Sequence, residues 1–301
     1  MKKLNYLFYL LTFSLLFITS CSSDDDSDSS NSSTVNVNKN TVVAGGDSAI
    51  MRLEFPRVKG GNSVVIVHRT TGDSYDPDGI NYCIEWDCDK KSQRWSCYQM
   101  HSGYTGSYSR VSSGYPNDPN LSSGDYYEED YIYGSGYQHG HICPSADRKY
   151  SYTANEQTFY MTNMQPQYAR FNGYEGSEQG LWLRLENKVR DLVPHTKTDT
   201  LYVCKGGTID NEDQIISRIQ GKLIVPKYFF MALMLKHSSG YRAVAFWMEQ
   251  TNQWATDVDL ADYAITIDEL EEKTGIDFFC NLPDDIEERI ESSYSENAWS
   301  L

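Results

Sequence analysis

The sequence has no excess of positive charge. Of its 301 residues, 42 are acidic and 26 are basic, which gives a formal net charge of −16. Surfaces that bind nucleic acid are usually basic because they neutralise phosphates, so this balance argues mildly against such a partner. It does not exclude a nuclease, since a bound divalent cation and a few local Lys or Arg residues can dominate the potential of one cleft.

Internal repeats, a βαβ rhythm and a linker after residue 45 are also absent. Strand-like and helix-like segments are interspersed, which predicts one α+β domain over residues 46–301, with a mostly antiparallel central sheet and flanking helices. Strands are expected over 63–70, 82–86, 94–100, 136–143, 157–164, 200–204, 228–236 and 241–248. Helices are expected over 177–193, 266–275 and 284–292, and turns at 206–207 and 238–240.

No cysteine pair has CxxC spacing. Apart from Cys21, six cysteines remain, an even number that permits disulfides in an oxidising compartment. The spacing does not specify which cysteines would pair, so no disulfide is predicted.

The N-terminus is an expected targeting segment. Lys2 and Lys3 precede an apolar run over residues 4–18, which is too short to span a membrane comfortably. The small residues before Cys21 resemble a bacterial lipobox, which implies a signal peptide over 1–20, lipidation of Cys21 and attachment to a bacterial outer membrane. A plain signal peptide is the alternative.

Residues 21–45 are acidic, rich in Ser and Asp and nearly free of hydrophobic side chains in their first part, so a disordered tether is expected there. This tether is either a simple spacer or a signal for export to the cell surface. Both alternatives place the domain outside the cytoplasm.

The densest set of reactive side chains lies between residues 137 and 191. His139 and His141 alternate along an expected strand and therefore share a face. A neutral imidazole accepts a proton from water near neutral pH, so His141 is a candidate base for hydrolysis. Zinc binding by the two histidines with Cys143 is the alternative, but no second cluster supplies the remaining ligands.

Oxygen ligands suited to a hard cation such as Mg²⁺ follow the histidines in the chain. They are Asn163, Asn172, Glu178 and Glu186. Arg190 lies four residues after Glu186, on the same face of the expected helix. Taken alone, a Glu–Arg pair at this spacing is more often a surface ion pair than a catalytic pair.

Taken in order, these residues resemble the DNA/RNA non-specific endonuclease family, whose ββα-metal site carries an Asp-Arg-Gly-His motif. The four motif positions here read Gln138, His139, Gly140 and His141. The resemblance extends over about residues 50–295 and includes 144–148, 158–159, 162–167, 171–172, 182 and 185–186.

The resemblance implies a Mg²⁺-dependent endonuclease that cuts both DNA and RNA. His141 would be the general base, Glu186 would hold a metal-bound water, and Arg190 would contact phosphate or the developing charge. His139 and Arg148 would contact the substrate. One residue before the helix would bind Mg²⁺ directly; we favour Asn172, with Glu178 as the alternative if residues 173–178 are not an insertion.

One departure from the family motif affects the expected activity. The motif arginine is His139 here, and an imidazole carries a positive charge only when it is protonated. We therefore expect lower activity or a preference for acidic pH. Two other functions stay open: a catalytically impaired lipoprotein that binds nucleic acid or a partner, and a carbohydrate-binding surface lipoprotein. Nothing in the sequence specifies an oligomeric state.

Overall fold

A computed structural model describes residues 35–72, 76–104, 106–112 and 114–301. The expected signal peptide, Cys21 and most of the expected tether lie outside these residues. Within the described part of the chain, no helix is both long and apolar enough to cross a membrane.

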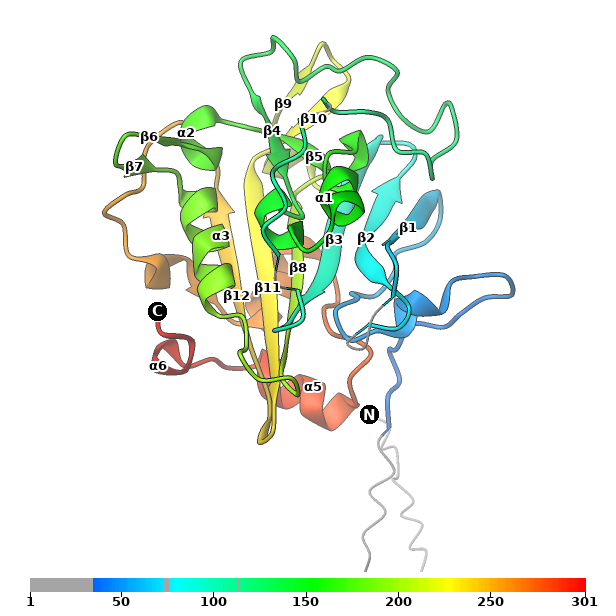
Figure 1. Ribbon diagram of the computed structural model, residues 1–301, viewed down its shortest axis with the longest axis vertical. Helices are drawn as coiled ribbons and strands as arrows, with labels where there is room; N and C mark the ends of the chain where they lie inside the picture. The colour runs from blue at the N-terminus through cyan, green and yellow to red at the C-terminus, as the bar shows by residue number, and fades with distance from the viewer. Residues whose placement is uncertain (1–34, 73–75, 105, 113) are drawn as a thin grey trace, which may run out of the picture. The chain divides into compact units, whose positions relative to one another are not determined.

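A seven-stranded antiparallel sheet forms the centre of the described domain (Figure 1). Its strands, in spatial order, are β1 (Ser63–Arg69), β2 (Ile80–Asp87), β3 (Ser92–Met100), β8 (Thr200–Gly207), β11 (Tyr228–His237), β12 (Gly240–Glu249) and β13 (Ala264–Ile265). The predicted α+β class with a mostly antiparallel sheet is confirmed.

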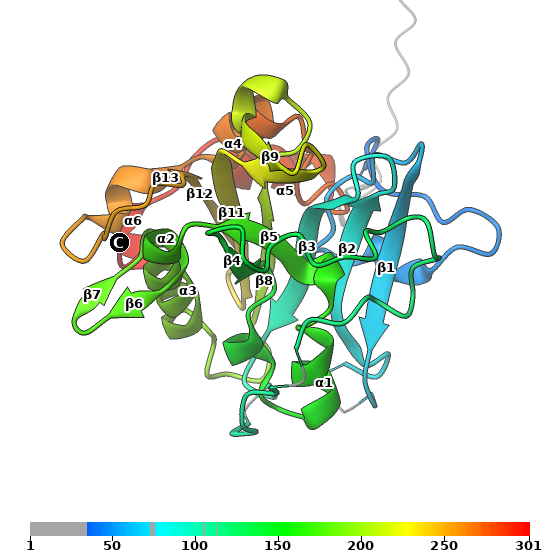
Figure 2. The same ribbon diagram turned by 90° about the horizontal axis from the view of Figure 1, so that it is seen from above.

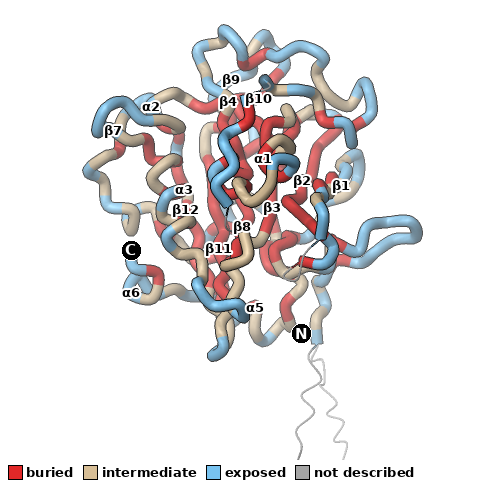
Figure 3. The backbone as a smooth tube through the Cα atoms, in the orientation of Figure 1, coloured by how far each residue is buried: buried red, intermediate tan, exposed pale blue. Residues whose placement is uncertain are grey.

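Each face of this sheet is covered by its own hydrophobic core, because neighbouring residues of a strand point to opposite faces. Val203 of β8 belongs to one core, which contains the buried side of helix α3 (Leu181–Asp191). Cys204 belongs to the other core, which contains buried residues of α4 (Ile267–Thr274) and α5 (Asp284–Glu291). The central strands are accordingly buried along most of their length (Figure 3). Helices α4 and α5 lie on one side of the sheet, and α1 (Tyr152–Gln157) lies on the other (Figure 2).

Three small two-stranded sheets and two short α-helices, besides several 3₁₀ turns, surround this framework in the described part of the chain. The sheets pair β4 (Gln138–His141) with β5 (Met164–Gln167), β6 (Tyr174–Glu175) with β7 (Glu178–Gln179), and β9 (Ile215–Ile219) with β10 (Leu223–Pro226). The short helices are α2 (Ala169–Asn172) and α6 (Glu296–Trp299).

The predicted strand over residues 157–164 is wrong. Helix α1 occupies the start of this segment, begins at an N-cap in which Ser151 accepts from the Ala154 amide, and is followed by a 3₁₀ turn over Met161–Asn163. The segment's run of Thr, Phe and Tyr favours a strand locally, but strand β5 begins only at Met164.

The expected turn at residues 206–207 is also wrong, because β8 continues through both glycines. A Cβ atom at Gly206 would lie 2.6 Å from the ring of Phe230. These glycines therefore allow close packing within the sheet and do not reverse the chain.

Part of the segment expected as a tether packs on the domain. Asn40 is buried, with its side-chain amide donating to the backbone oxygens of Ile50 and Pro56. The six cysteines of this domain are buried and free.

Candidate active site

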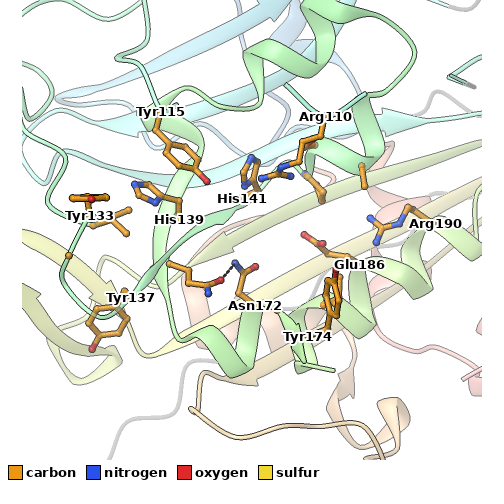
Figure 4. A pocket seen from close by; sticks show the side chains of 18 residues that line it. Arg110, Tyr115, Tyr133, Tyr137, His139, His141, Asn172, Tyr174, Glu186 and Arg190 are labelled. Atoms are coloured by element: carbon orange, nitrogen blue, oxygen red, sulfur yellow. Dashed lines mark hydrogen bonds between the residues drawn. The ribbon is translucent and has the colours of Figure 1, made fainter. Parts of the chain in front are cut away.

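The β4–β5 ribbon presents His141 to a cleft of about 470 Å³ (Figure 4). His141 pairs with Met164 in the ribbon, and Gly140 pairs with Gln165. A Cβ atom at Gly140 would lie 2.3 Å from the Gln167 side chain, so the glycine leaves room for this buried side chain beside the histidine.

The surroundings of the His141 ring favour its neutral form. His141 is 8% exposed, and the ring of Phe159 packs edge-on against it with the centroids 5.0 Å apart. Burial, assisted by the nearby charge of Arg110, lowers its pKa to about 3, while a hydrogen bond to the His139 backbone opposes the shift. Its Nε2 has no hydrogen-bond partner among the described residues, which leaves this nitrogen free to accept a proton.

Helix α3 places Glu186 and Arg190 on the same cleft, as their i, i+4 spacing predicts. Glu186 is 8% exposed, and burial raises its pKa to about 7, against the opposing charges of Lys205 and Arg190. The predicted helix is confirmed, but it begins at Leu181 instead of residue 177. The preceding residues form the β6–β7 hairpin, whose turn contains Gly176 at φ +60°.

The two candidates for the metal ligand are separated by this hairpin. Asn172, the last residue of α2, lines the cleft, and its Nδ2 donates to Oε1 of Gln138 over 3.4 Å (Figure 4). That bond leaves Oδ1 of Asn172 available to a cation. Glu178 lies outside the cleft lining on the exposed hairpin, where it accepts from Thr256. The geometry therefore favours Asn172, because the hairpin holds Glu178 away from the cleft.

Asn172 and Glu186 fit a hard divalent cation. Both offer oxygen ligands to the same cleft, and the Glu186 carboxylate forms no direct ion pair within the described part of the chain, since Arg190 pairs with Asp147. Asn163, another oxygen ligand in the sequence, is fully buried, and its side chain bonds to the backbone of Cys143 and Thr158. Asn163 therefore holds two backbone segments together and does not line the cleft.

Arg148 was predicted to contact substrate, and the structure contradicts this. Its side chain is fully buried, its guanidinium lies 4.3 Å from the centre of the Tyr98 ring, and it donates to the backbone oxygen of Gln99. A phosphate in the cleft cannot reach a guanidinium enclosed in this way.

His139 does line the cleft, but its ring has two other partners. It stacks on Tyr115 with ring centroids 3.8 Å apart and an angle of 4° between the planes. Its Nε2 lies 2.8 Å from a carboxylate oxygen of Asp130. Where the family motif has an arginine, this chain therefore has a histidine that stacks on Tyr115 and pairs with Asp130.

Three site residues were missed by sequence reasoning. Arg110 lines the cleft from an exposed loop segment and adds a permanent positive charge near His141. Asp147 is buried and pairs with Arg190. Lys205 is fully buried beneath Glu186 and Asp147, and burial lowers its pKa. For Lys205, the sequence offers one signal, a lysine directly after the apolar residues Val203 and Cys204 of an expected strand. No local pattern marks Arg110 or Asp147 as a site residue.

Comparison with known proteins agrees with this geometry. Residues 64–285 match the family model described as DNA/RNA non-specific endonuclease. A nuclease of Nostoc sp. is 31% identical over 238 residues, covering 74% of this chain and 80% of that protein. The chain belongs to the DNA/RNA non-specific endonuclease family.

More distant members of the family show the same relationship over shorter stretches. Mitochondrial endonuclease G of Bos taurus is 27% identical over 189 residues, covering 56% of this chain and 60% of that protein. The nuclease of Serratia marcescens is 24% identical over 137 residues, covering 46% of this chain and 49% of that protein. The chain thus spans about half to three fifths of the length of these two relatives.

The fold of the family is shared as well. A crystal structure of the EndoG/EndoGI complex superposes with a TM-score of 0.58 at 18% identity, covering 75% of this chain and 91% of that one. The predicted ββα-metal core is confirmed at the level of the fold, with β4 and β5 as its two strands and α3 as its helix.

Proposed function

We propose that this protein is a Mg²⁺-dependent endonuclease that hydrolyses phosphodiester bonds of DNA and RNA. The observation that carries the proposal is the convergence of a free imidazole nitrogen of His141 with the oxygens of Asn172 and Glu186 in one cleft. Hydrolysis of a phosphodiester requires a base for water and positive charge for the phosphate, and this cleft contains groups for both.

His141 is the proposed general base. Burial keeps its ring neutral at neutral pH, and the backbone hydrogen bond of the ring leaves Nε2 to take the proton from the attacking water. The low pKa of the free protein makes this a weak base. A phosphate in the cleft adds negative charge beside the ring, which raises the pKa and strengthens the base when substrate is bound.

Positive charge for the phosphate comes from two arginines and a cation. Arg110 lines the cleft from a loop, and Arg190 lines it from helix α3. Asn172 and Glu186 would hold the Mg²⁺ ion, which supplies charge to the phosphate and to the leaving oxygen. Gln138 positions Asn172 through its hydrogen bond, so a residue that departs from the family motif keeps a role in the site.

The proposal places this activity outside the cytoplasm. It rests on the N-terminal residues 1–20, which have the pattern of a lipoprotein signal peptide, and on Cys21 as the lipidated residue. The lipid would anchor the domain to a bacterial outer membrane through the acidic segment that follows. Globomycin, which blocks lipoprotein signal cleavage, should cause the uncleaved form to accumulate; the same protein with Cys21→Ser should not respond.

Cleavage of plasmid DNA and of ribosomal RNA by the chain from Ser22 tests the proposed activity. We expect cutting of both with Mg²⁺ and none with chelator. A folded protein that binds these nucleic acids but cuts neither at any pH from 5 to 9 would support the alternative, a binding protein. In that case the replacement of the motif arginine by the paired His139 would be the first suspected cause.

A further inference from the structure

A second group of carboxylates lies on the sheet face opposite the cleft. Asp268 and Glu271 of α4 and Glu291 of α5 each place one oxygen within 4.8 Å of the others. Helices α4 and α5 pack on the core that contains Cys204, whereas the cleft helix α3 packs on the core that contains Val203 (Figure 2). This acidic cluster is therefore separate from the proposed nuclease site.

Glu291 gives an independent indication that a ligand is needed. Its side chain is buried, with the residue 6% exposed, and its Oε1 has no hydrogen-bond partner in the part of the chain that the structure describes. An unpaired carboxylate oxygen in such a position is costly because it has lost water and gained no donor. The same carboxylate contributes an oxygen to the cluster that it forms with Asp268 and Glu271.

The other charged groups around the cluster do not provide the missing positive charge. Burial raises the pKa of Glu291 to about 10, and the neighbouring charges that act on it most strongly are all acidic: Glu271, Glu287, Asp268 and Asp277. Burial raises the pKa of Asp277, and Arg57 only partly opposes this shift; the Arg57 guanidinium is hydrogen-bonded to the backbone of Asn38 and Lys39.

Two of the neighbouring acids, Glu287 and Asp277, accept hydrogen bonds from a neutral side chain. The Nδ2 of Asn38 lies 2.9 Å from Oε1 of Glu287 and 3.2 Å from Oδ2 of Asp277. Glu271 also accepts the backbone amide of Phe278 over 2.7 Å, which fixes its carboxylate toward the cluster. Asp268, Glu271 and Glu291 remain as the three that can share one ion.

We propose that Asp268, Glu271 and Glu291 bind a structural divalent cation, with Ca²⁺ as the best match. Ca²⁺ takes oxygen ligands at about 2.3–2.6 Å, so one ion reaches oxygens up to roughly 5 Å apart without moving the helices. Asp268 is exposed, which provides the entry path and room for water ligands. The ion joins α4 to α5 and removes the repulsion among the acids, so it stabilises the domain without taking part in hydrolysis.

Thermal unfolding of the chain from Ser22, carrying Asn172→Ala to disable the cleft site, tests this proposal. At pH 7.5 we expect millimolar Ca²⁺ to raise the Tm by about 5 °C over the chelator control, and Mg²⁺ to raise it less. Glu291→Gln should abolish the Ca²⁺ response. It should leave the protein folded, because an amide replaces a carboxylate that is under strong repulsion.

Asp285→Asn is the matched control, since Asp285 is exposed on the same helix and is not among the charges that act most strongly on Glu291. It should keep the full Ca²⁺ response. No Ca²⁺ stabilisation of the parent protein, or an equal response in Glu291→Gln, would overturn the proposal and leave shared protons as the means of neutralising the cluster. Because the readout is stability, this result is independent of whether the protein cleaves nucleic acid.

Discussion

The guanidinium of Arg190 is held from below by the carboxylate of Asp147, with Nη1 2.8 Å from Oδ1. The other oxygen of Asp147 accepts the Tyr98 hydroxyl over 2.9 Å, and the Asp147 side chain is fully buried. Asp147 therefore positions a cleft arginine without reaching the cleft surface, in the way that buried acids orient catalytic cations.

Asp147→Asn should lower kcat for DNA cleavage about tenfold, because Arg190 loses its charged anchor. We also expect the free energy of unfolding to fall by about 1–3 kcal/mol, as a buried bond to a charged partner is weakened. Asp191→Asn, at an exposed position of the same helix, is the control and should change neither. In an Arg190→Ala background Asp147→Asn should have no further effect on kcat; additive effects would contradict a positioning role.

Mg²⁺ activation should depend on pH through Glu186. Its pKa is raised to about 7 by burial, so the carboxylate is mostly protonated at pH 6 and mostly ionised at pH 8. Since a cation competes with the proton, the half-saturating Mg²⁺ concentration for cleavage should fall about tenfold between these pH values. Glu186→Gln should weaken activation and remove this pH dependence; an unchanged profile in that variant would assign the titration to another group.

Arg110 should contribute to catalysis although it lies on a loop outside the sequence motif. Arg110→Ala should reduce kcat/KM for both DNA and RNA by about 10- to 100-fold without changing the Tm, because its side chain is exposed and adds charge to the cleft. Lys236→Ala removes an exposed cation from outside the cleft and should have little effect. Equal effects of the two variants would mean that only overall charge matters.

Restoring the family arginine at position 139 should raise activity at pH 8. The reason is that an arginine guanidinium carries a permanent positive charge, which would lie at the edge of the cleft. His139→Arg can retain both the stack on Tyr115 and the pair with Asp130. His139→Gln, which is never charged, is the comparison; equal rates for Arg and Gln at pH 8 would show that position 139 supplies no useful charge.

The sequence was informative where local chemistry and chain order agree. Glu186 and Arg190 share a helix face because of their spacing, and His141 lies on a strand bounded by Pro144, so their convergence could be predicted. The capping box of Thr266 and Glu269 and the left-handed Gly275 likewise mark α4 as expected. These features depend on short-range geometry that a sequence displays directly.

The remainder depends on contacts between distant segments. Arg148 resembles a substrate ligand in sequence, yet the rings of Tyr98 and Tyr104 enclose it. Gly206 resembles a turn residue in sequence, yet it lies within β8, where the missing side chain leaves room for Phe230 of the neighbouring strand. Arg110 joins the site through a loop whose path no local pattern specifies. Tertiary packing decides each of these cases, so a local reading of the sequence could not.

The most direct test of the account is the rate of plasmid cleavage by His141→Ala compared with His195→Ala, at saturating Mg²⁺ and pH 8. His195 is exposed and lies outside the cleft, so it controls for the loss of an imidazole. We expect His141→Ala to lose at least about a hundredfold in kcat, with Mg²⁺ activation constants and Tm close to those of the parent, and His195→Ala to be unaffected. Cleavage by a folded His141→Ala at the parent rate would contradict the assignment of His141 as the base.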